Sequence, residues 1–399
     1  MNWKAVAGAL ALGTISMTAH AQETGPVRIG VITDISGAYS DIDGAAGIEV
    51  VKWAVDDFGG KLLGRPIEIL SADHQNKSDI ASMTAREWID NNKLNMLIGG
   101  TNSATLLAMA KVAADRKIPF LATGPGTARL TNEDCTPFTV HYSAYDTAAV
   151  TKVGATALVK AGNTTWFFLA ADYTFGQSLA GDAARVVKSL DGKVVGEVRA
   201  PLGTTDFSSF LLQAQSSGAQ ILAMANAGRD FANAMKASKE FGIGNSMKVA
   251  GLLVFINEIH SLGLDTAGGL QLADSWYWDQ DDASRKFARR FYEKYKRMPS
   301  NIQAADYSAA MSYLKAAEKA GTTDGTKVME ALKSMPIKDF FNEGHIRADG
   351  RLIHNVHLFR VKTPAESKEP WDYYELIATV PGEVAFISPA ESKCELLKK

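Results

Sequence analysis

Short apolar runs alternate with longer segments of helical period along the chain. In the clearest case, the apolar runs Leu94–Ile98 and Ile118–Ala122 flank a segment with apolar side chains three and four residues apart. This order predicts a strand, a helix and a second, parallel strand. A similar alternation starts at the buried-strand pattern Val27–Thr33 and recurs over 146–274. The pattern therefore predicts an α/β protein whose two halves share a doubly wound architecture.

Two neighbouring turns of this unit are rich in small polar residues. Gly99–Ser103 follows the first run, and Thr123–Thr127 follows the second. Carboxyl ends of parallel strands meet at one edge of a sheet, where helix amino termini offer N–H groups and positive partial charge. These turns predict a site for a small anion, most simply a carboxylate, although small polar residues occur in such turns of any α/β protein.

Two further loops at strand ends carry large side chains. The loop Asp34–Gly44 contains Tyr39 and Ile42, which we expect to project over the sheet edge toward a ligand. The turn Ala171–Ser178 has aromatic residues at its tip. These loops extend the predicted site toward apolar ligand groups.

The amino terminus has the features of a secretory signal peptide. Lys4 precedes an apolar stretch, and Ala19–Ala21 is a small-residue cleavage site, so cleavage is expected before Gln22. The apolar stretch is shorter than the ~20 residues of a membrane-spanning helix. No cysteine lies beside the cleavage site to carry a lipid anchor. The mature protein is expected to be exported and soluble in a periplasm.

Length, charge and cysteine content limit the class of protein. A chain of 399 residues exceeds what one core usually supports, so two domains are expected. A net charge of -2 leaves no basic field for nucleic acid or an anionic membrane. Cys135 and Cys394 could pair in an oxidising compartment and tie the carboxyl terminus to the loop after residue 131, or they could be unrelated thiols.

The sequence lacks recognisable catalytic motifs. Ser178 lies in the run GQSLAG, which does not have the G-x-S-x-G spacing of a nucleophilic serine, and neither G-x-G-x-x-G nor G-x-x-x-x-G-K-[ST] occurs. His354 and His357 would point to opposite faces of a strand, and His74 is expected in a surface loop. We therefore expect no enzymatic activity, no metal site and no cofactor.

Three stretches together carry a resemblance to a known family. They read VRIGVITDISGAYSDIDGAAGIEVVKWAVDDFGGKLLGRPIEIL, IGGTNSATLLAMAKVAADRKIPFLATGPG and ADYTFGQSLAGDA. In this order they resemble the leucine/isoleucine/valine-binding proteins, the type I periplasmic substrate-binding proteins that serve ABC importers. The resemblance implies two doubly wound α/β lobes joined by three crossover strands, with a cleft between the lobes that closes on a ligand.

The resemblance also implies roles for individual residues. Asn102 and Ser103 match the first-lobe turn that holds the ligand carboxylate, and Thr123 and Gly124 match the neighbouring turn. Tyr173 matches an aromatic residue that closes over the ligand from the second lobe. The expected ligand-binding residues are Tyr39, Ile42, Asn102, Ser103, Thr123, Gly124, Tyr145, Tyr173, Phe175, Asn226, Ala227, Leu253 and Trp278.

The chain departs from the amino-acid binders of this family in one region. Those proteins place an acidic residue at a second-lobe strand end to receive the ligand ammonium group, whereas this chain reads AGLLVF over Ala250–Phe255. A buried ammonium without a carboxylate partner is strongly unfavourable, so a ligand without an amine is expected. Alternatively, Glu258 or Asp306 could supply the missing charge, which would favour a branched-chain or other hydrophobic amino acid.

An aromatic acid of the benzoate or phenylpropanoid kind is the favoured ligand. Its ring could stack on aromatic side chains. The candidates are Tyr39, Tyr145, Tyr173, Phe175, Trp276, Tyr277 and Trp278. The ending, with VHLFRVK, EPWDYYELIATVPGE and a late cysteine, resembles a subgroup associated with such acids.

The resemblance finally implies the domain division and the partners. We expect a signal peptide over 1–21, a first lobe over 26–145 plus 275–352, a second lobe over 146–274 plus 353–390, and a tail over 391–399. Strands predicted at Val356–Val361 and Tyr373–Ala378 would complete one lobe. The expected protein is a periplasmic monomer that captures a small carboxylate by hinge closure and delivers it to an ABC permease in the inner membrane. A ligand-sensing receptor subunit is the alternative.

Overall fold

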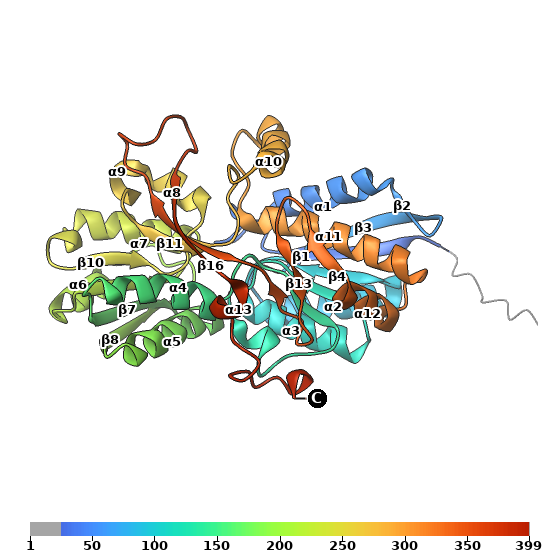
Figure 1. Cartoon of the computed structure of the whole chain (residues 1–399), viewed down its shortest axis with the longest axis horizontal. Coiled ribbons are helices and arrows are strands. Elements are labelled where there is room, and N and C mark those ends of the chain that lie inside the picture. The colour runs from blue at the N-terminus through green and yellow to red at the C-terminus, as the bar shows by residue number, and fades with distance from the viewer. Residues whose placement is uncertain (1–24, 399) are drawn as a thin grey trace, which may run out of the picture.

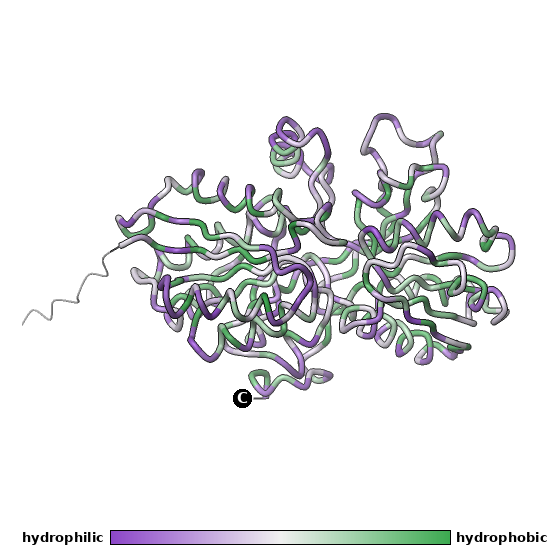
Figure 2. Tube along the Cα trace, turned by 180° about the vertical axis from the view of Figure 1, so that it is seen from behind, coloured by the Kyte–Doolittle hydropathy of each residue, from purple (hydrophilic) through white to green (hydrophobic). Residues whose placement is uncertain are grey.

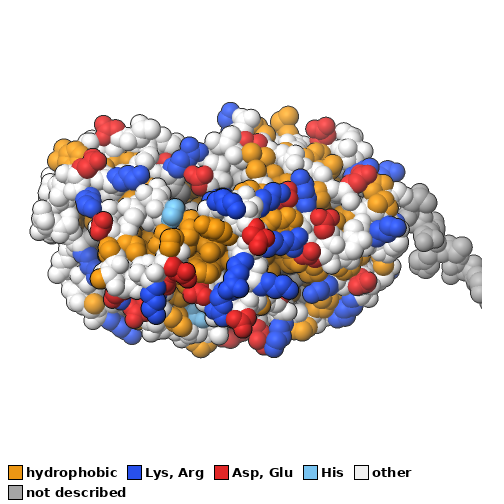
Figure 3. Space-filling view, turned by 90° about the horizontal axis from the view of Figure 1, so that it is seen from above, with side chains coloured by type: hydrophobic (Ala, Val, Ile, Leu, Met, Phe, Trp, Pro, Cys, Tyr) orange, Lys and Arg blue, Asp and Glu red, His pale blue; other side chains and the backbone are white. Residues whose placement is uncertain are grey.

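Two open sheets organise the chain into two lobes that lie side by side (Figure 1). The computed structural model describes residues 25–398, and the predicted signal peptide lies outside them. Apolar residues follow the strands inside each lobe, and hydrophilic residues follow many of the outer helices (Figure 2). On the face seen in Figure 3, basic and acidic side chains are interspersed, as the net charge of -2 suggests. Between residues 25 and 398 no helix is long and apolar enough to cross a membrane.

The first lobe begins with ten elements. They are β1 (Val27–Thr33), α1 (Gly44–Phe58), β2 (Lys61–Leu62), β3 (Arg65–Asp73), α2 (Ser78–Asn92), β4 (Met96–Gly99), α3 (Ser103–Asp115), β5 (Phe120–Ala122), η1 (Ala128–Thr131) and β6 (Thr139–His141). The strands form one sheet in the order β2-β3-β1-β4-β5-β6, in which only the β2–β3 pair is antiparallel. Strands β4 and β5 are buried along their whole length, which explains their continuous apolar runs.

The second lobe repeats this plan around a smaller sheet. Its elements are α4 (Thr147–Lys160), β7 (Thr165–Ala171), α5 (Thr174–Ser189), β8 (Lys193–Ala200), α6 (Ser208–Ser216), β9 (Ile221–Ala225), α7 (Arg229–Glu240), η2 (Ile243–Asn245), β10 (Lys248–Gly251), α8 (Ile256–Leu262), α9 (Leu264–Ala267) and β11 (Gln271–Asp274). Strands β10-β9-β7-β8 pair in parallel in this order. The predicted repetition of a doubly wound architecture is therefore confirmed.

The rest of the chain returns to each lobe in turn. The elements α10 (Asp282–Tyr295), α11 (Asn301–Ala320), α12 (Gly325–Ser334), β12 (Pro336–Lys338), β13 (Glu343–Ile346) and β14 (Leu352–Ile353) come first, and α11 packs on α1 of the first lobe. Next, β15 (Val356–Val361) and β16 (Tyr374–Val380) join β11 in an antiparallel sheet beside α4. The two strands predicted near the end of the chain are thus present. Up to β16 the chain passes between the lobes three times, next to the lobe boundaries that we propose.

The carboxyl-terminal segment forms a covalent strap between the lobes. Helix α13 (Gly382–Ala385) packs on α4 of the second lobe. The chain then crosses to the first lobe, where Cys394 forms a disulfide with Cys135 just before η3 (Glu395–Leu397). The expected disulfide is therefore present.

Two fully buried carboxyl groups link α1 to α11 below the carboxyl edge of the first sheet. Asp43, which precedes α1, and Asp306, on α11, are each 1% exposed, and carboxyl oxygens of both lie against Gly47. A Cβ atom on Gly47 would lie 1.9 Å from Asp43 and 2.5 Å from Asp306, so only glycine leaves room for the pair. Burial raises the pKa of Asp43 from 3.8 to about 6, and burial together with the nearby Asp43 charge raises the pKa of Asp306 well above its usual range.

Removal of the disulfide is expected to destabilise the protein. The bond joins residues 259 positions apart. Closure of so long a loop lowers the entropy of the unfolded chain and stabilises the fold by about 5 kcal/mol. Calorimetry of the oxidised protein and of a Cys135→Ser/Cys394→Ser variant should show a clearly lower Tm for the variant. Equal Tm values would contradict this role.

The carboxyl pair is expected to make stability depend on pH. Because its pKa values are raised in the folded state, the folded protein keeps a proton that the unfolded chain releases between pH 3.8 and about 6. The stabilisation is complete below this window and is lost as the pH rises through it. Asp306→Asn replaces one of the two titrating carboxyl groups by an amide. The unfolding free energy of this variant should therefore fall less between pH 4 and 7 than that of wild type.

Urea unfolding at a series of pH values measures this slope. Asp191→Asn, at an exposed position, serves as the control and should behave as wild type. The interpretation fails if Asp306→Asn and wild type have the same pH dependence.

Candidate ligand-binding site

A small cavity lies between the lobes, at the carboxyl ends of both parallel sheets. Its volume is about 20 Å³, enough for one water molecule. Of the expected ligand-binding residues, all except Thr123, Asn226 and Trp278 line it. The lining adds Thr101, Gly126 and Phe255. The sequence thus identified most of a set of residues that comes together from both lobes.

The lobes touch each other around this cavity, so the structure is a closed one. The hydroxyl groups of Tyr39 and Tyr173 hydrogen bond across the cleft at 2.6 Å. Thr127 and Ser178 do the same at 2.9 Å. The backbone N–H of Arg229 donates to the Ala38 carbonyl at 3.2 Å, and its guanidinium donates to the Gly37 carbonyl.

Close approach at this contact requires a glycine. Gly228 precedes α7 with a φ of 67°, and a Cβ atom there would lie 2.6 Å from the Ala38 carbonyl oxygen of the opposite lobe. Both the left-handed backbone and the short distance exclude a side chain. Gly228 therefore allows the second lobe to close on the loop that carries Tyr39.

The first-lobe wall is the turn between β4 and α3. Asn102 has a φ of 74°, and its side-chain oxygen accepts hydrogen bonds from the N–H groups of Ala104 and Thr105 at 3.0 and 3.2 Å. This cap occupies two N–H donors that could otherwise bind an anion. Asn102 shapes the turn, and its side-chain amide donates to Asn76 at 3.0 Å.

Thr101 carries a polar group that has no partner within residues 25–398. Its side-chain oxygen is buried without a hydrogen bond, and the residue lines the cavity. Its carbonyl receives a hydrogen bond from Nε2 of His74 at 3.0 Å, because Nδ1 of His74 accepts from the Asn76 N–H. A buried hydroxyl without a partner is costly, so a ligand that accepts its hydrogen bond would gain affinity.

The expectation for His74 was wrong. The side chain is fully buried, and burial lowers the pKa of its imidazole. It fixes the carbonyl of Thr101 and thus supports the turn from below. The burial of His74 could not be predicted from its polar loop, because the side chain packs against the turn between β4 and α3, which comes later in the chain.

Ser103 and the Gly124–Thr127 turn form the floor. The Ser103 hydroxyl oxygen accepts a hydrogen bond from the Thr127 N–H at 3.1 Å, so its own hydrogen can be donated to a ligand. A Cβ atom on Gly126 would lie 2.6 Å from the ring of Phe175, which places an aromatic ring of the second lobe directly over this turn.

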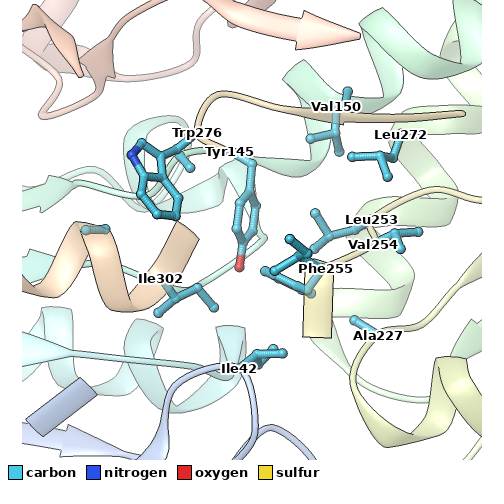
Figure 4. Packing of buried hydrophobic residues seen from close by; sticks show 14 of the residues in the cluster. Ile42, Tyr145, Val150, Ala227, Leu253, Val254, Phe255, Leu272, Trp276 and Ile302 are labelled. Carbon is cyan, nitrogen blue, oxygen red and sulfur yellow. The ribbon is translucent and has the colours of Figure 1, made fainter. Parts of the chain in front are cut away.

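Tyr145 enters the cavity from the first crossover between the lobes. Figure 4 shows its ring pointing between Ile42 of the first lobe and Phe255 of the second. Its hydroxyl donates to the Gly124 carbonyl at 3.0 Å, and its ring meets Phe255 edge to face at 5.6 Å. Burial raises the pKa of Tyr145, as it does for Tyr39 and Tyr173, so these phenols stay protonated.

No side chain among the described lining residues carries a formal charge. Glu258 lies outside the lining, where its carboxyl group accepts hydrogen bonds from the N–H groups of Gly228 and Phe255, the latter at 2.7 Å. Burial raises the pKa of Glu258 to about 8. Asp306 is equally absent from the lining and lies buried beside Asp43. The arrangement offers hydroxyl and backbone donors together with aromatic rings.

Three expected residues lie elsewhere for identifiable reasons. The Thr123 hydroxyl turns toward the sheet and donates to the Gly99 carbonyl at 3.0 Å. Asn226 is buried outside the lining, and its side-chain oxygen has no hydrogen bond among the described residues. The indole of Trp278 donates to the Trp371 carbonyl at 2.9 Å, which holds it in an aromatic cluster of the second crossover.

Comparison with known proteins agrees with this geometry. Residues 26–368 match the periplasmic binding protein family. A periplasmic binding protein from Burkholderia mallei has a crystal structure that is 59% identical, with a TM-score of 0.92 over 93% of this chain and 99% of that one. A branched-chain amino acid ABC transporter periplasmic ligand-binding protein from Burkholderia xenovorans is 37% identical, with a TM-score of 0.81 over 93% of this chain and 100% of that one.

More distant relatives share the fold. A Leu/Ile/Val-binding protein homologue from Brucella melitensis is 24% identical, over 82% of this chain and 84% of its own. A solute-binding protein from R. palustris, determined in complex with benzoate, is 18% identical, with a TM-score of 0.81 over 93% of this chain and 100% of that one. The family match covers most of the chain, and the two lobes, the crossovers and the interlobe cavity fit it. The chain therefore belongs to the periplasmic binding protein family, among relatives of the Leu/Ile/Val-binding type.

Proposed function

We propose that this protein is the periplasmic solute-binding component of an ABC importer and that its ligand is an aromatic carboxylate of the benzoate or phenylpropanoid kind. The observation that carries this proposal is the uncharged interlobe cavity, which combines hydroxyl donors at the α3 terminus with aromatic walls. The protein acts as a monomer and delivers the ligand to a membrane permease.

The composition of the wall favours a ligand with one anionic group and no amine. The donors are uncharged, namely the hydroxyls of Thr101 and Ser103 beside the positive end of α3. An ammonium group would be buried without a carboxylate, which is strongly unfavourable. Phe175 and Phe255 supply apolar ring surface on the second-lobe side. The benzoate complex of the R. palustris protein supports this ligand class on the same fold.

Transport requires the cleft to open and close. A cavity of about 20 Å³ is several times too small for a benzoate-sized molecule, so the lobes separate to admit the ligand and then close around it less tightly than they do here. Ligand contacts with both lobes favour the closed state. The alternative ligand is a branched-chain amino acid, because the B. xenovorans relative is the ligand-binding protein of a branched-chain amino acid ABC transporter.

A thermal-shift screen of the mature protein tests the ligand class. A ligand that binds only the folded state raises the Tm by mass action. Benzoate, 4-hydroxybenzoate and 3-phenylpropanoate are expected to raise it, whereas L-leucine and L-valine are not. A rise with the amino acids alone would replace the proposal by amino-acid binding, and no rise with any of these compounds would favour a sensor of another ligand.

Thr101→Val is expected to weaken ligand binding without a loss of stability. Valine keeps the shape of threonine and removes a buried hydroxyl that has no partner in the ligand-free protein, so the Tm stays equal or rises. The dissociation constant for benzoate should increase roughly tenfold, as for a lost hydrogen bond to a charged group of about 1.5 kcal/mol.

Ser238→Ala provides the matched control for this variant. Its hydroxyl is also buried and unpartnered, but it lies on α7 outside the cavity lining. Calorimetric titration of both variants with benzoate should show a change only for Thr101→Val. Unchanged affinity in both would place Thr101 outside the ligand contacts.

A further inference from the structure

The first crossover between the lobes is held from one side by a single buried guanidinium. The Arg351 guanidinium donates to three carbonyl oxygens of this crossover, at 3.2 Å to His141, 2.8 Å to Ser143 and 3.4 Å to Tyr145. A further carbonyl, that of Ala144, accepts a hydrogen bond from the hydroxyl of Ser275 of the second crossover. Nε2 of His354, from the third crossover, lies 3.4 Å from the Ser143 carbonyl oxygen, so all three crossovers meet at residues 141–145.

The charge of Arg351 is deeply buried and compensated locally. The residue is 1% exposed, and its Nε lies 3.6 Å from a carboxylate oxygen of Asp146. The ring of Phe386, from the carboxyl-terminal strap, lies 4.0 Å from the guanidinium carbon. Burial lowers the pKa of Arg351 to about 10, which leaves the group charged at neutral pH.

This cluster is directly connected to the ligand cavity. Tyr145, whose carbonyl binds Arg351, places its ring in the cavity and its hydroxyl on the Gly124 carbonyl of the first lobe. The next residue, Asp146, caps α4 of the second lobe through the Ala149 N–H at 2.8 Å. A change in the crossover backbone at Arg351 would therefore move a cavity wall and the start of a second-lobe helix together.

We propose that Arg351 is a positioning residue for ligand binding, which holds the crossover backbone so that the Tyr145 ring stands in the cavity and its hydroxyl reaches Gly124. The role of Arg351 in ligand binding rests on the proposed function. Its role in positioning Tyr145 rests only on the geometry of the crossover. Lysine cannot replace arginine in this role. Its ammonium is a single point, whereas the planar guanidinium presents donors to three separate carbonyl groups at once.

A double-mutant cycle between Arg351 and Tyr145 tests the inference without a ligand. Tyr145→Phe removes the hydroxyl bond to Gly124 and should lower the Tm of the wild-type protein by about 2 °C. In an Arg351→Lys background the hydroxyl no longer reaches Gly124, so the same substitution should have almost no further effect. Arg351→Lys keeps the buried charge beside Asp146 and hence the fold.

Tyr277→Phe supplies the control cycle. Its hydroxyl also donates to a backbone carbonyl, that of Trp371 at 3.0 Å, on a different crossover. Its effect should be equal in the wild-type and Arg351→Lys backgrounds, because groups without shared partners act additively. Additive effects for Tyr145→Phe as well would overturn the inference, since Arg351 would then be a general structural residue.

Titration with benzoate extends the test to binding. Arg351→Lys should raise the dissociation constant about tenfold in the wild-type background and little in the Tyr145→Phe background. An unchanged affinity for Arg351→Lys would overturn the proposed role in binding. If benzoate does not bind wild type, the proposed ligand class fails, and the ligand-free cycle still decides whether Arg351 positions Tyr145.

Discussion

The Arg351 guanidinium is charged and almost completely enclosed, and the path of the chain between the lobes depends on how that charge is satisfied. Three carbonyl groups of one crossover, the Asp146 carboxylate and the Phe386 ring surround it. Removing one partner of a buried charge leaves that charge uncompensated, which is strongly destabilising. The crossovers and the carboxyl-terminal strap are thus packed around one centre, and the disulfide from Cys394 to Cys135 closes the strap onto the first lobe.

The cavity differs from the surroundings of Arg351, because no described side chain of its lining carries a formal charge. The lobes close through hydroxyl pairs and backbone groups, such as Tyr39 with Tyr173 and Arg229 with the loop before Tyr39. Each of these contacts contributes little net free energy, because the polar groups lose hydrogen bonds to water when the lobes close. Contacts of this kind allow the lobes to close and to reopen readily, as a binding protein for import requires. Near the cavity, Glu258 instead accepts hydrogen bonds from the second lobe, and Asp306 lies close to Asp43 in the first lobe.

Local sequence patterns predicted the elements, and these patterns together with the family resemblance predicted most of the cavity lining. The β4–α3–β5 unit was evident from its apolar runs, and the residues that follow strands, such as Ser103 and Tyr173, lie where parallel topology places them. The burial of His74, the role of Arg351 and the orientation of Trp278 could not be predicted, because they depend on segments more than 25 positions away in the chain. Thr101 lies in a recognised turn, but only the structure shows that this residue lines the cavity and that its hydroxyl is buried without a partner.

An uncharged cavity between the lobes should select a carboxylate without an amine. The most direct test is calorimetric titration of the mature protein with 3-phenylpropanoate and with L-phenylalanine, two molecules that differ by the ammonium group alone. The account predicts binding of 3-phenylpropanoate and no measurable binding of L-phenylalanine, because nothing in the described lining neutralises an ammonium ion. Tight binding of L-phenylalanine with weak or absent binding of 3-phenylpropanoate would contradict it.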